Sequence, residues 1–167
     1  MKKIFFIIFF IFQLINIYHA ENKIVFLDIN FVLTNCVKGK TILKKLDIIK
    51  KKNLEILKKD ETLLLNEEND IKKKRNIISQ EEFNSKVKKF KTKINEFNNK
   101  KNLLTNEFNT KKEEEINKLL RSINPIIQEY VKNNSISIVF DKKNVLIGKT
   151  DYDITNEILK NVNSKLN

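Results

Sequence analysis

The middle of the chain, residues 41–131, contains no glycine and a single proline, Pro125. Glycine and proline are the residues that most often end or bend a helix and form tight turns. Charged residues and asparagine dominate this segment, and its apolar residues recur at helical spacing. The whole chain of 167 residues holds only 2 Gly and 1 Pro, too few for the many turns of a sandwich or a barrel built by one chain. We therefore expect long, unbroken helices.

A heptad repeat of apolar residues runs through the second half of this segment. The predicted seam consists of Phe83, Val87, Phe90, Ile94, Phe97, Leu104 and Phe108, with Lys101 at the remaining position. The first half carries a weaker repeat, formed by Leu43, Leu57, Leu64, Ile71 and Ile78, supported by Leu46 and Leu54 and interrupted at Lys50. Repeats of this kind predict helices that pack along a coiled-coil seam.

A helix start separates the two repeats. Ser79 is followed three residues later by Glu82, which is the pattern of a capping box at a helix N-terminus. We therefore expect a turn near residues 78–80, with residues 41–78 and 80–132 forming an antiparallel hairpin. At 1.5 Å per residue these helices would be about 57 Å and about 78 Å long. One partner helix cannot cover the whole apolar stripe of the other. We therefore expect an arm of this kind to depend on its base for stability.

Both ends of the chain have β character. Residues 23–33 are rich in β-branched and aromatic side chains, which is typical of a buried strand that leads into a short helix. Near the other end we expect a β hairpin, with strands at residues 135–140 and 145–147 and a turn at 141–144. Asp153 then caps a last helix.

The predicted fold class is α+β, with a long antiparallel coiled-coil hairpin on a small β body. The arm comprises residues 41–132, and the body comprises residues 21–40 and 133–167. The body holds only about 55 residues, which is too few for a robust core of its own. We therefore expect an obligate oligomer, in which strands from several chains close one sheet and remove its open edges.

The first twenty residues have the layout of a secretory signal peptide. A short basic start precedes an apolar run over residues 4–15, and a more polar stretch ends at Ala20. The alternative is an uncleaved membrane anchor, although spanning a bilayer takes about 20 apolar residues. Cleavage after Ala20 would remove Lys2 and Lys3 and lower the formal charge by two, from +12 to +10. Cleavage would also remove the only histidine. A signal peptide of this kind predicts export to the periplasm.

Positive charge is concentrated around the predicted turn. Residues 70–101 hold eleven Lys and Arg residues against four acidic ones, a net charge of +7. We single out Lys72, Lys73, Lys74, Arg75, Lys86, Lys88, Lys89, Lys91 and Lys93 as candidates for binding an anionic partner. That partner would be an acidic client, lipopolysaccharide or an anionic lipid, because export argues against nucleic acid. A solvated helical face, enriched in lysine by an AT-rich genome, is the alternative.

No motif predicts a catalytic residue, a metal site or a cofactor. Residues 39–41 and 148–150 each match the end of a phosphate-binding loop, but both lack its leading glycine. Asp28 and Asn30 follow an apolar strand and resemble the first motif of haloacid-dehalogenase-type phosphatases. Asn30 stands where that motif requires a second aspartate. The single cysteine, Cys36, is expected to pack as a small apolar side chain.

The chain resembles the OmpH-like family of periplasmic outer-membrane protein chaperones, which includes Skp. The resemblance begins with the strand and helix entry at residues 23–33, followed by Gly39 and Lys40 and a long charged hairpin. It ends with residues 139–147 and with Tyr152-Asp-Ile-Thr155, which lead into the last helix. It covers essentially all of the chain after residue 20, although the middle matches only as a pattern.

The resemblance implies a homotrimer whose shared β body carries three helical arms. It also implies that unfolded outer-membrane β-barrel proteins are held between the arms without ATP. Candidates for the trimer body are Val25, Leu27, Ile138, Phe140, Val145 and Ile147. Two other functions remain open, namely a structural coiled-coil envelope protein without clients and the phosphatase.

Overall fold

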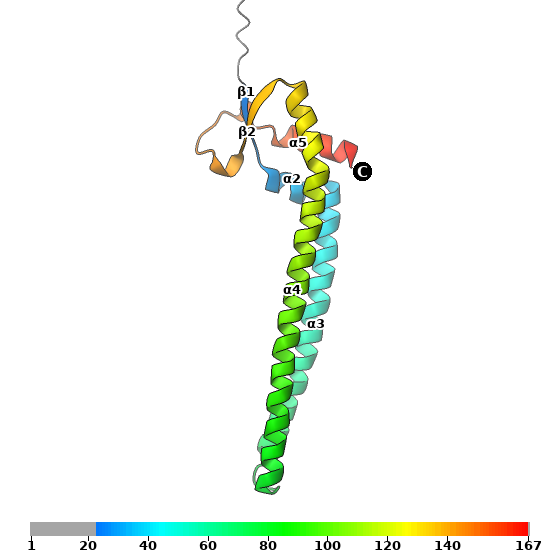
Figure 1. Ribbon diagram of the computed structural model, residues 1–167, viewed down its shortest axis with the longest axis vertical. Helices are drawn as coiled ribbons and strands as arrows, with labels where there is room; N and C mark the ends of the chain where they lie inside the picture. Colours follow the sequence, from blue (N-terminus) through cyan, green and yellow to red (C-terminus); the bar gives the residue numbers. More distant parts are fainter. Residues whose placement is uncertain (1–22, 167) are drawn as a thin grey trace, which may run out of the picture.

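The computed structural model describes residues 23–166, and the predicted signal peptide with its cut after Ala20 lies outside them. Two long helices run side by side from a small body to a distant turn (Figure 1). The elements, in order, are β1 (Lys23–Leu27), α2 (Ile29–Asn35), α3 (Val37–Lys74), α4 (Gln80–Asn133), β2 (Ile136–Asp141), the short 3-10 helices η1 (Lys142–Asn144) and η2 (Thr150–Tyr152), and α5 (Thr155–Lys165). The α+β class is confirmed.

The arm is the antiparallel hairpin of α3 and α4. These helices have 38 and 54 residues, so they are about 57 Å and about 81 Å long. The hydroxyl of Ser79 accepts a hydrogen bond of 3.2 Å from the backbone N–H of Glu82, which confirms the predicted helix start. The turn between the helices therefore occupies residues 75–79.

The seam of α4 follows the predicted heptad. All seven of its predicted apolar residues are half-buried, and Lys101 is exposed. On α3 the prediction is right for Leu46 and Ile71, which are buried, and for Leu57 and Leu64, which are half-buried.

The seam prediction is wrong for two residues of α3. Leu43 is 40% exposed and Leu54 is 55% exposed. Near the base the seam instead follows Ile42, Leu46 and Ile49, and it changes to the line of Leu57 only further along. A helix with 3.6 residues per turn drifts relative to a strict heptad, so one seven-residue line cannot stay in the seam along all of α3.

The sheet of the body has two parallel strands. Val25 of β1 pairs with Val139 of β2, and Phe26 pairs with Phe140. The predicted β hairpin is wrong, because residues 145–147 form no strand in the described chain. The side chain of Asp141 accepts a hydrogen bond of 3.1 Å from the backbone N–H of Lys143, and this turn leads the chain away from the sheet.

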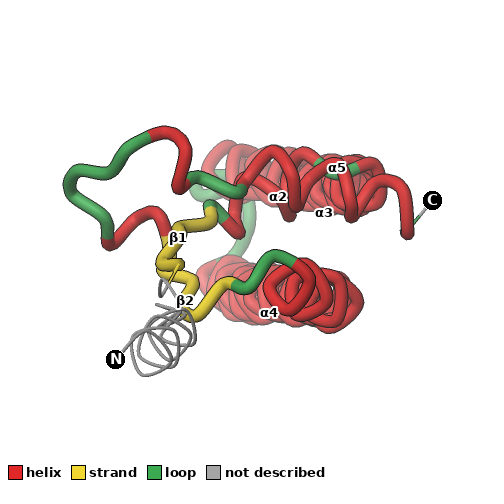
Figure 2. The backbone as a smooth tube through the Cα atoms, turned by 90° about the horizontal axis from the view of Figure 1, so that it is seen from above, coloured by secondary structure: helices red, strands yellow, loops and turns green. Residues whose placement is uncertain are grey.

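The chain returns to the sheet later than the sequence predicts. Phe26 forms an isolated parallel bridge with Asp153, and the backbone N–H of Ile154 donates to the carbonyl oxygen of Phe26 at 3.0 Å. The loop that carries η1 and η2 therefore extends away from the helices before it rejoins β1 (Figure 2).

The core lies where the sheet, α2, α5 and the base of α4 meet. The most deeply buried side chains are Val25, Val32, Cys36, Ile123, Ile158 and Val162. Cys36 is a free thiol, and its sulfur accepts from the backbone N–H of Gly39 at 3.3 Å, so its predicted packing role is confirmed. The body thus has a small core of its own, formed by segments from both ends of the described chain.

Asp153 connects the loop to α5 through its side chain. It accepts from the backbone N–H of Thr155 at 3.0 Å and forms a 2.7 Å ion pair with Lys142. Burial raises the pKa of Asp153, but the hydrogen bonds from Lys142 and Thr155 outweigh it, and the pKa lies below its usual range. The depressed pKa means that this carboxylate stabilises the folded body in its ionised form.

A pH-dependent loss of stability follows from this site. The contribution of Asp153 is fully present above the usual carboxyl range, near pH 4, and is lost as pH falls through its lower folded pKa. Replacing Asp153 by asparagine should cost about 1 kcal/mol at pH 7 and much less near pH 2 in urea unfolding. The exposed Asp151 provides the control, since Asp151→Asn should have little effect at either pH. An equal cost of Asp153→Asn at both pH values would contradict this account.

Candidate functional site at the arm tip and on the body

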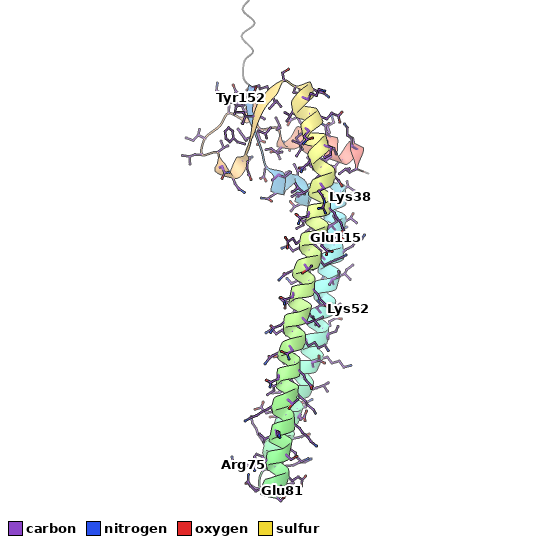
Figure 3. All side chains as sticks on the ribbon, viewed as in Figure 1. Lys38, Lys52, Arg75, Glu81, Glu115 and Tyr152 are labelled. Carbon is purple, nitrogen blue, oxygen red and sulfur yellow. The ribbon has the colours of Figure 1, made fainter. Side chains whose placement is uncertain are left out.

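The hairpin brings the two predicted basic segments together at the arm tip. Residues 72–75 end α3 and enter the turn, while residues 86–93 lie on the first turns of α4. Eight of the nine predicted basic side chains are exposed, and Lys86 is half-buried. Arg75 and Glu81 mark the far end of the arm in Figure 3. We call this region, residues 72–93, the basic tip.

Only three cations of the basic tip have a carboxylate partner among the described residues. Lys72 pairs with Glu68 at 2.6 Å and Lys86 pairs with Glu82 at 3.5 Å, both within one helix. Lys93 pairs with Glu67 across the hairpin at 2.7 Å. The cations left without an ion pair in the described chain are Lys73, Lys74, Arg75, Lys88, Lys89 and Lys91. Their charge is therefore available to an anionic partner.

Ile77 is an apolar residue of the tip that the sequence analysis did not single out. It lies in the turn between the helices and is 79% exposed, whereas the adjacent Ile78 is half-buried. A sequence signal exists, because Ile77 stands outside the heptad line on which Ile78 falls. The arm therefore ends in a protruding apolar side chain.

Two ion pairs join α3 and α4 along one side of the arm. Lys93 contacts Glu67 and Lys100 contacts Asp60, both at 2.7 Å. The two lysines are seven residues apart, and so are the two acids. The pairs therefore favour a single antiparallel register, although exposed pairs contribute only about 0–1 kcal/mol each. Lys93, predicted as a tip residue, thus has a structural contact inside the arm.

The predicted trimer-body residues fall into two groups. Val25 and Leu27 are 1% and 5% exposed within the single chain, so they belong to its own core. Ile138 and Phe140 are about half-exposed at 46% and 49%, and Ile147 is 90% exposed. Val145 is half-buried, and the assignment of these residues to a trimer interface stays a prediction.

An exposed apolar surface surrounds the sheet and the loop after β2. An open groove is lined by Ile24, Val25, Phe26, Phe140, Val145, Ile147, Gly148 and Tyr152. Leu146, which the sequence analysis did not select, is 96% exposed. Strand β2 also leaves one backbone edge without a ladder partner in the described chain, and the outer edge of β1 is bridged only between Phe26 and Asp153. We call this region the apolar face of the body.

The residues that match fragments of catalytic or phosphate-binding motifs have structural contacts. Asp28 caps α2, because its Oδ1 accepts from the backbone N–H of Phe31 at 2.8 Å. Gly39 lies in the first turn of α3 and Gly148 lies in the loop against Phe26. Within residues 23–166, no cluster of three or more potential metal-ligating side chains is found. None of the helices described there is long and apolar enough to cross a membrane.

Comparison with known proteins identifies the family. The family model of outer membrane proteins described as OmpH-like matches residues 23–162, most of the chain. This chain belongs to the OmpH-like family. A crystal structure from Caulobacter crescentus CB15, described provisionally as an outer membrane chaperone (OmpH-like), has the same fold. It aligns with a TM-score of 0.75 and 18% sequence identity over 86% of this chain and 85% of that one. No curated protein matches this chain significantly.

Proposed function

We propose that this OmpH-like protein is an ATP-independent holdase chaperone of the periplasm. It binds unfolded outer-membrane β-barrel proteins and prevents their aggregation in transit. The observation that carries this proposal is the family match over residues 23–162, on a chain whose arm and body follow the family's fold. In this proposal residues 1–20 are a cleaved signal peptide, and no catalytic residue, metal or cofactor takes part.

The apolar face of the body supports assembly into a homotrimer. Leu146 and Ile147 are almost fully exposed, Ile147 lines an open groove, and the outer edge of β2 has no ladder partner in the described chain. Exposed strand edges with apolar neighbours favour pairing with another chain. In the proposed trimer, residues 21–40 and 133–167 form the shared body, and residues 41–132 of each chain form one arm.

The arms support client binding in two ways. Their outer surface exposes scattered aliphatic side chains, including Ile48, Leu54, Leu63 and Leu103, at 55–66%. The unpaired cations of the basic tip attract acidic clients and raise their rate of capture. Contacts that are individually weak and distributed over three arms allow a client to be held and still released.

A light-scattering assay tests the proposal. Residues 21–167, added in near-stoichiometric amounts without ATP, should suppress aggregation of an outer-membrane β-barrel protein diluted from urea. A scrambled peptide or an unrelated coiled coil of similar charge is the control. If aggregation proceeds as with the control, the chaperone proposal fails, and a structural coiled-coil protein of the envelope becomes the better account.

A further inference from the structure

An apolar groove lies in the middle of the arm, between α3 and α4. Near the base the seam of α3 follows Ile49, further along it follows Leu57, and the half-buried Asn53 stands between them. An asparagine side chain does not provide the apolar volume of the leucine or isoleucine found elsewhere in the seam. The seam is therefore incompletely filled at this point. It opens into a groove of about 180 Å³ whose apolar lining consists of Leu54, Leu57, Leu104 and Phe108.

Three polar residues complete the lining of this space, which we call the mid-arm groove. They are Lys50, Asn53 and Thr105. The hydroxyl of Thr105 donates to the carbonyl oxygen of Lys101 at 2.8 Å, within α4. Among the described residues, Lys50 has no carboxylate partner and the side-chain amide of Asn53 has no hydrogen-bond partner. One unpaired cation and one unpaired amide therefore border an apolar space.

A second groove of the arm, closer to the tip, offers different chemistry. Lys93 and Lys100 line it, but they are paired with Glu67 and Asp60, and Glu96 adds a further acid. Among the described residues, no acid lines the mid-arm groove, and its one cation is unpaired. The mid-arm groove therefore suits a ligand that combines an apolar group with negative charge.

We propose that the mid-arm groove binds one aromatic side chain of an unfolded client, with an acidic residue two positions away on the same side of the extended client chain. An apolar cavity of about 150 Å³ accommodates benzene, so the groove has the size of a single ring. Phe108 provides an aromatic neighbour for that ring, Lys50 a partner for the carboxylate, and Asn53 a partner for the client backbone. The inference rests on the proposed function, whose β-barrel clients carry girdles of aromatic residues.

A second copy of this chain does not supply the ring from its arm. The exposed aromatic residues of the described chain are Phe31, Phe140 and Tyr152, which belong to α2, β2 and η2 of the body. The phenylalanines of the arm are half-buried in the seam of their own hairpin, namely Phe83, Phe90, Phe97 and Phe108. The occupant of the groove is therefore a different chain.

Tryptophan fluorescence of a peptide gives a direct test, because the protein itself contains no tryptophan. The probe is a peptide of sequence Asp-Thr-Trp-Thr-Asp with blocked ends. When it is titrated with residues 21–167, its emission should shift to the blue and saturate. The same peptide with phenylalanine should compete at similar concentrations, whereas the one with leucine should need about threefold more. The proposal is overturned if no saturable shift occurs, or if the leucine peptide or decanoate competes equally well.

A groove-filling variant locates the binding site. Thr105→Leu adds apolar volume at an exposed position of the groove and should weaken peptide binding by about fivefold or more. Thr92→Leu is the matched control, because the hydroxyl of Thr92 also donates to the carbonyl oxygen four residues earlier in α4, and Thr92 is exposed and outside the groove. Circular dichroism should show both variants to be as helical as the parent. Equal losses for the two variants, or no loss for Thr105→Leu, would contradict the assignment.

The charge beside the groove is tested separately. Lys50→Gln should weaken binding of the acidic peptide severalfold and leave binding of its asparagine analogue unchanged. Lys52→Gln removes the same charge at an exposed position of α3 outside the groove and should have little effect (Figure 3). Equal effects of the two substitutions would mean that net charge alone attracts the peptide, and would overturn the proposal. A protein that suppresses aggregation normally but does not bind the peptide disproves only this inference, and one that binds the peptide without suppressing aggregation disproves only the proposed function.

Discussion

Replacing both Phe90 and Phe97 by aspartate is expected to unfold the distal half of the arm and to leave the body folded. Both phenylalanines are half-buried in the seam, where they face α3 in the region of Leu64 and Ile71. On α3, Asp60 and Glu67 occupy neighbouring half-buried positions, where they pair with lysines of α4. Two new carboxylates would be placed in the half-buried seam, so the cost of removing their charge from water adds to the loss of apolar burial.

The expected cost is about 3–5 kcal/mol, concentrated between residues 60 and 100. Circular dichroism should show a loss of helix, and hydrogen exchange should show fast exchange in the distal arm with a protected core around Ile123. Asn95→Asp with Asn98→Asp adds the same charge at exposed positions of the same stretch and should change little. Global unfolding, or dissociation of the proposed trimer in sedimentation, would show that the arm seam also holds the body together.

The heptad predicted the arm well because a coiled coil is specified locally. The seam residues of α4 lie one turn apart except across Lys101, so periodicity alone identifies the buried side, and Ser79 marks the helix start. The exceptions on α3 have a geometric cause. Leu43 and Leu54 are exposed because the helix rotates relative to a strict seven-residue repeat. Lys50, seven residues after Leu43, already indicated that this repeat leaves the seam near the base.

The body was harder to predict because its contacts join distant segments. The sequence pattern of residues 145–147 is that of a strand, and yet Leu146 and Ile147 are exposed and unpaired within the described chain. Instead, Asp153 forms the bridge to Phe26, across more than a hundred residues. Local propensity does not specify which segment pairs with a strand when several compete.

The candidate functional surfaces also have features that the sequence predicts and features that depend on the tertiary structure. The charge of the basic tip is visible in the sequence, since hairpin topology and lysine counts are enough to locate it. Which cations are free is not visible, because Lys93 contacts Glu67 on the other helix, 26 residues away. The exposure of Ile77 likewise depends on the detailed path of the turn.

Gly39 is the position where the smallest substitution is expected to have a large effect. It lies in the first turn of α3 directly after the break at Cys36, and a Cβ built there would collide with the backbone carbonyl oxygen of Leu33 in α2. It would also lie 3.1 Å from the sulfur of Cys36. The carbonyl belongs to backbone and cannot rotate away, so relief requires α2 and α3 to move apart at the base of the arm.

Gly39→Ala should therefore destabilise the protein by about 2–4 kcal/mol, although Gly→Ala within a helix normally stabilises by about 0.5–1 kcal/mol. The sign of the change is decisive, because only the close approach of α2 reverses the ordinary propensity effect. Urea unfolding of Gly39→Ala should show a lower midpoint, while Lys40→Ala, at the adjacent exposed position, should be neutral or slightly stabilising. A Gly39→Ala variant as stable as its parent would mean that the junction of α2 and α3 yields easily, and that the arm is less firmly joined to the body than this packing implies.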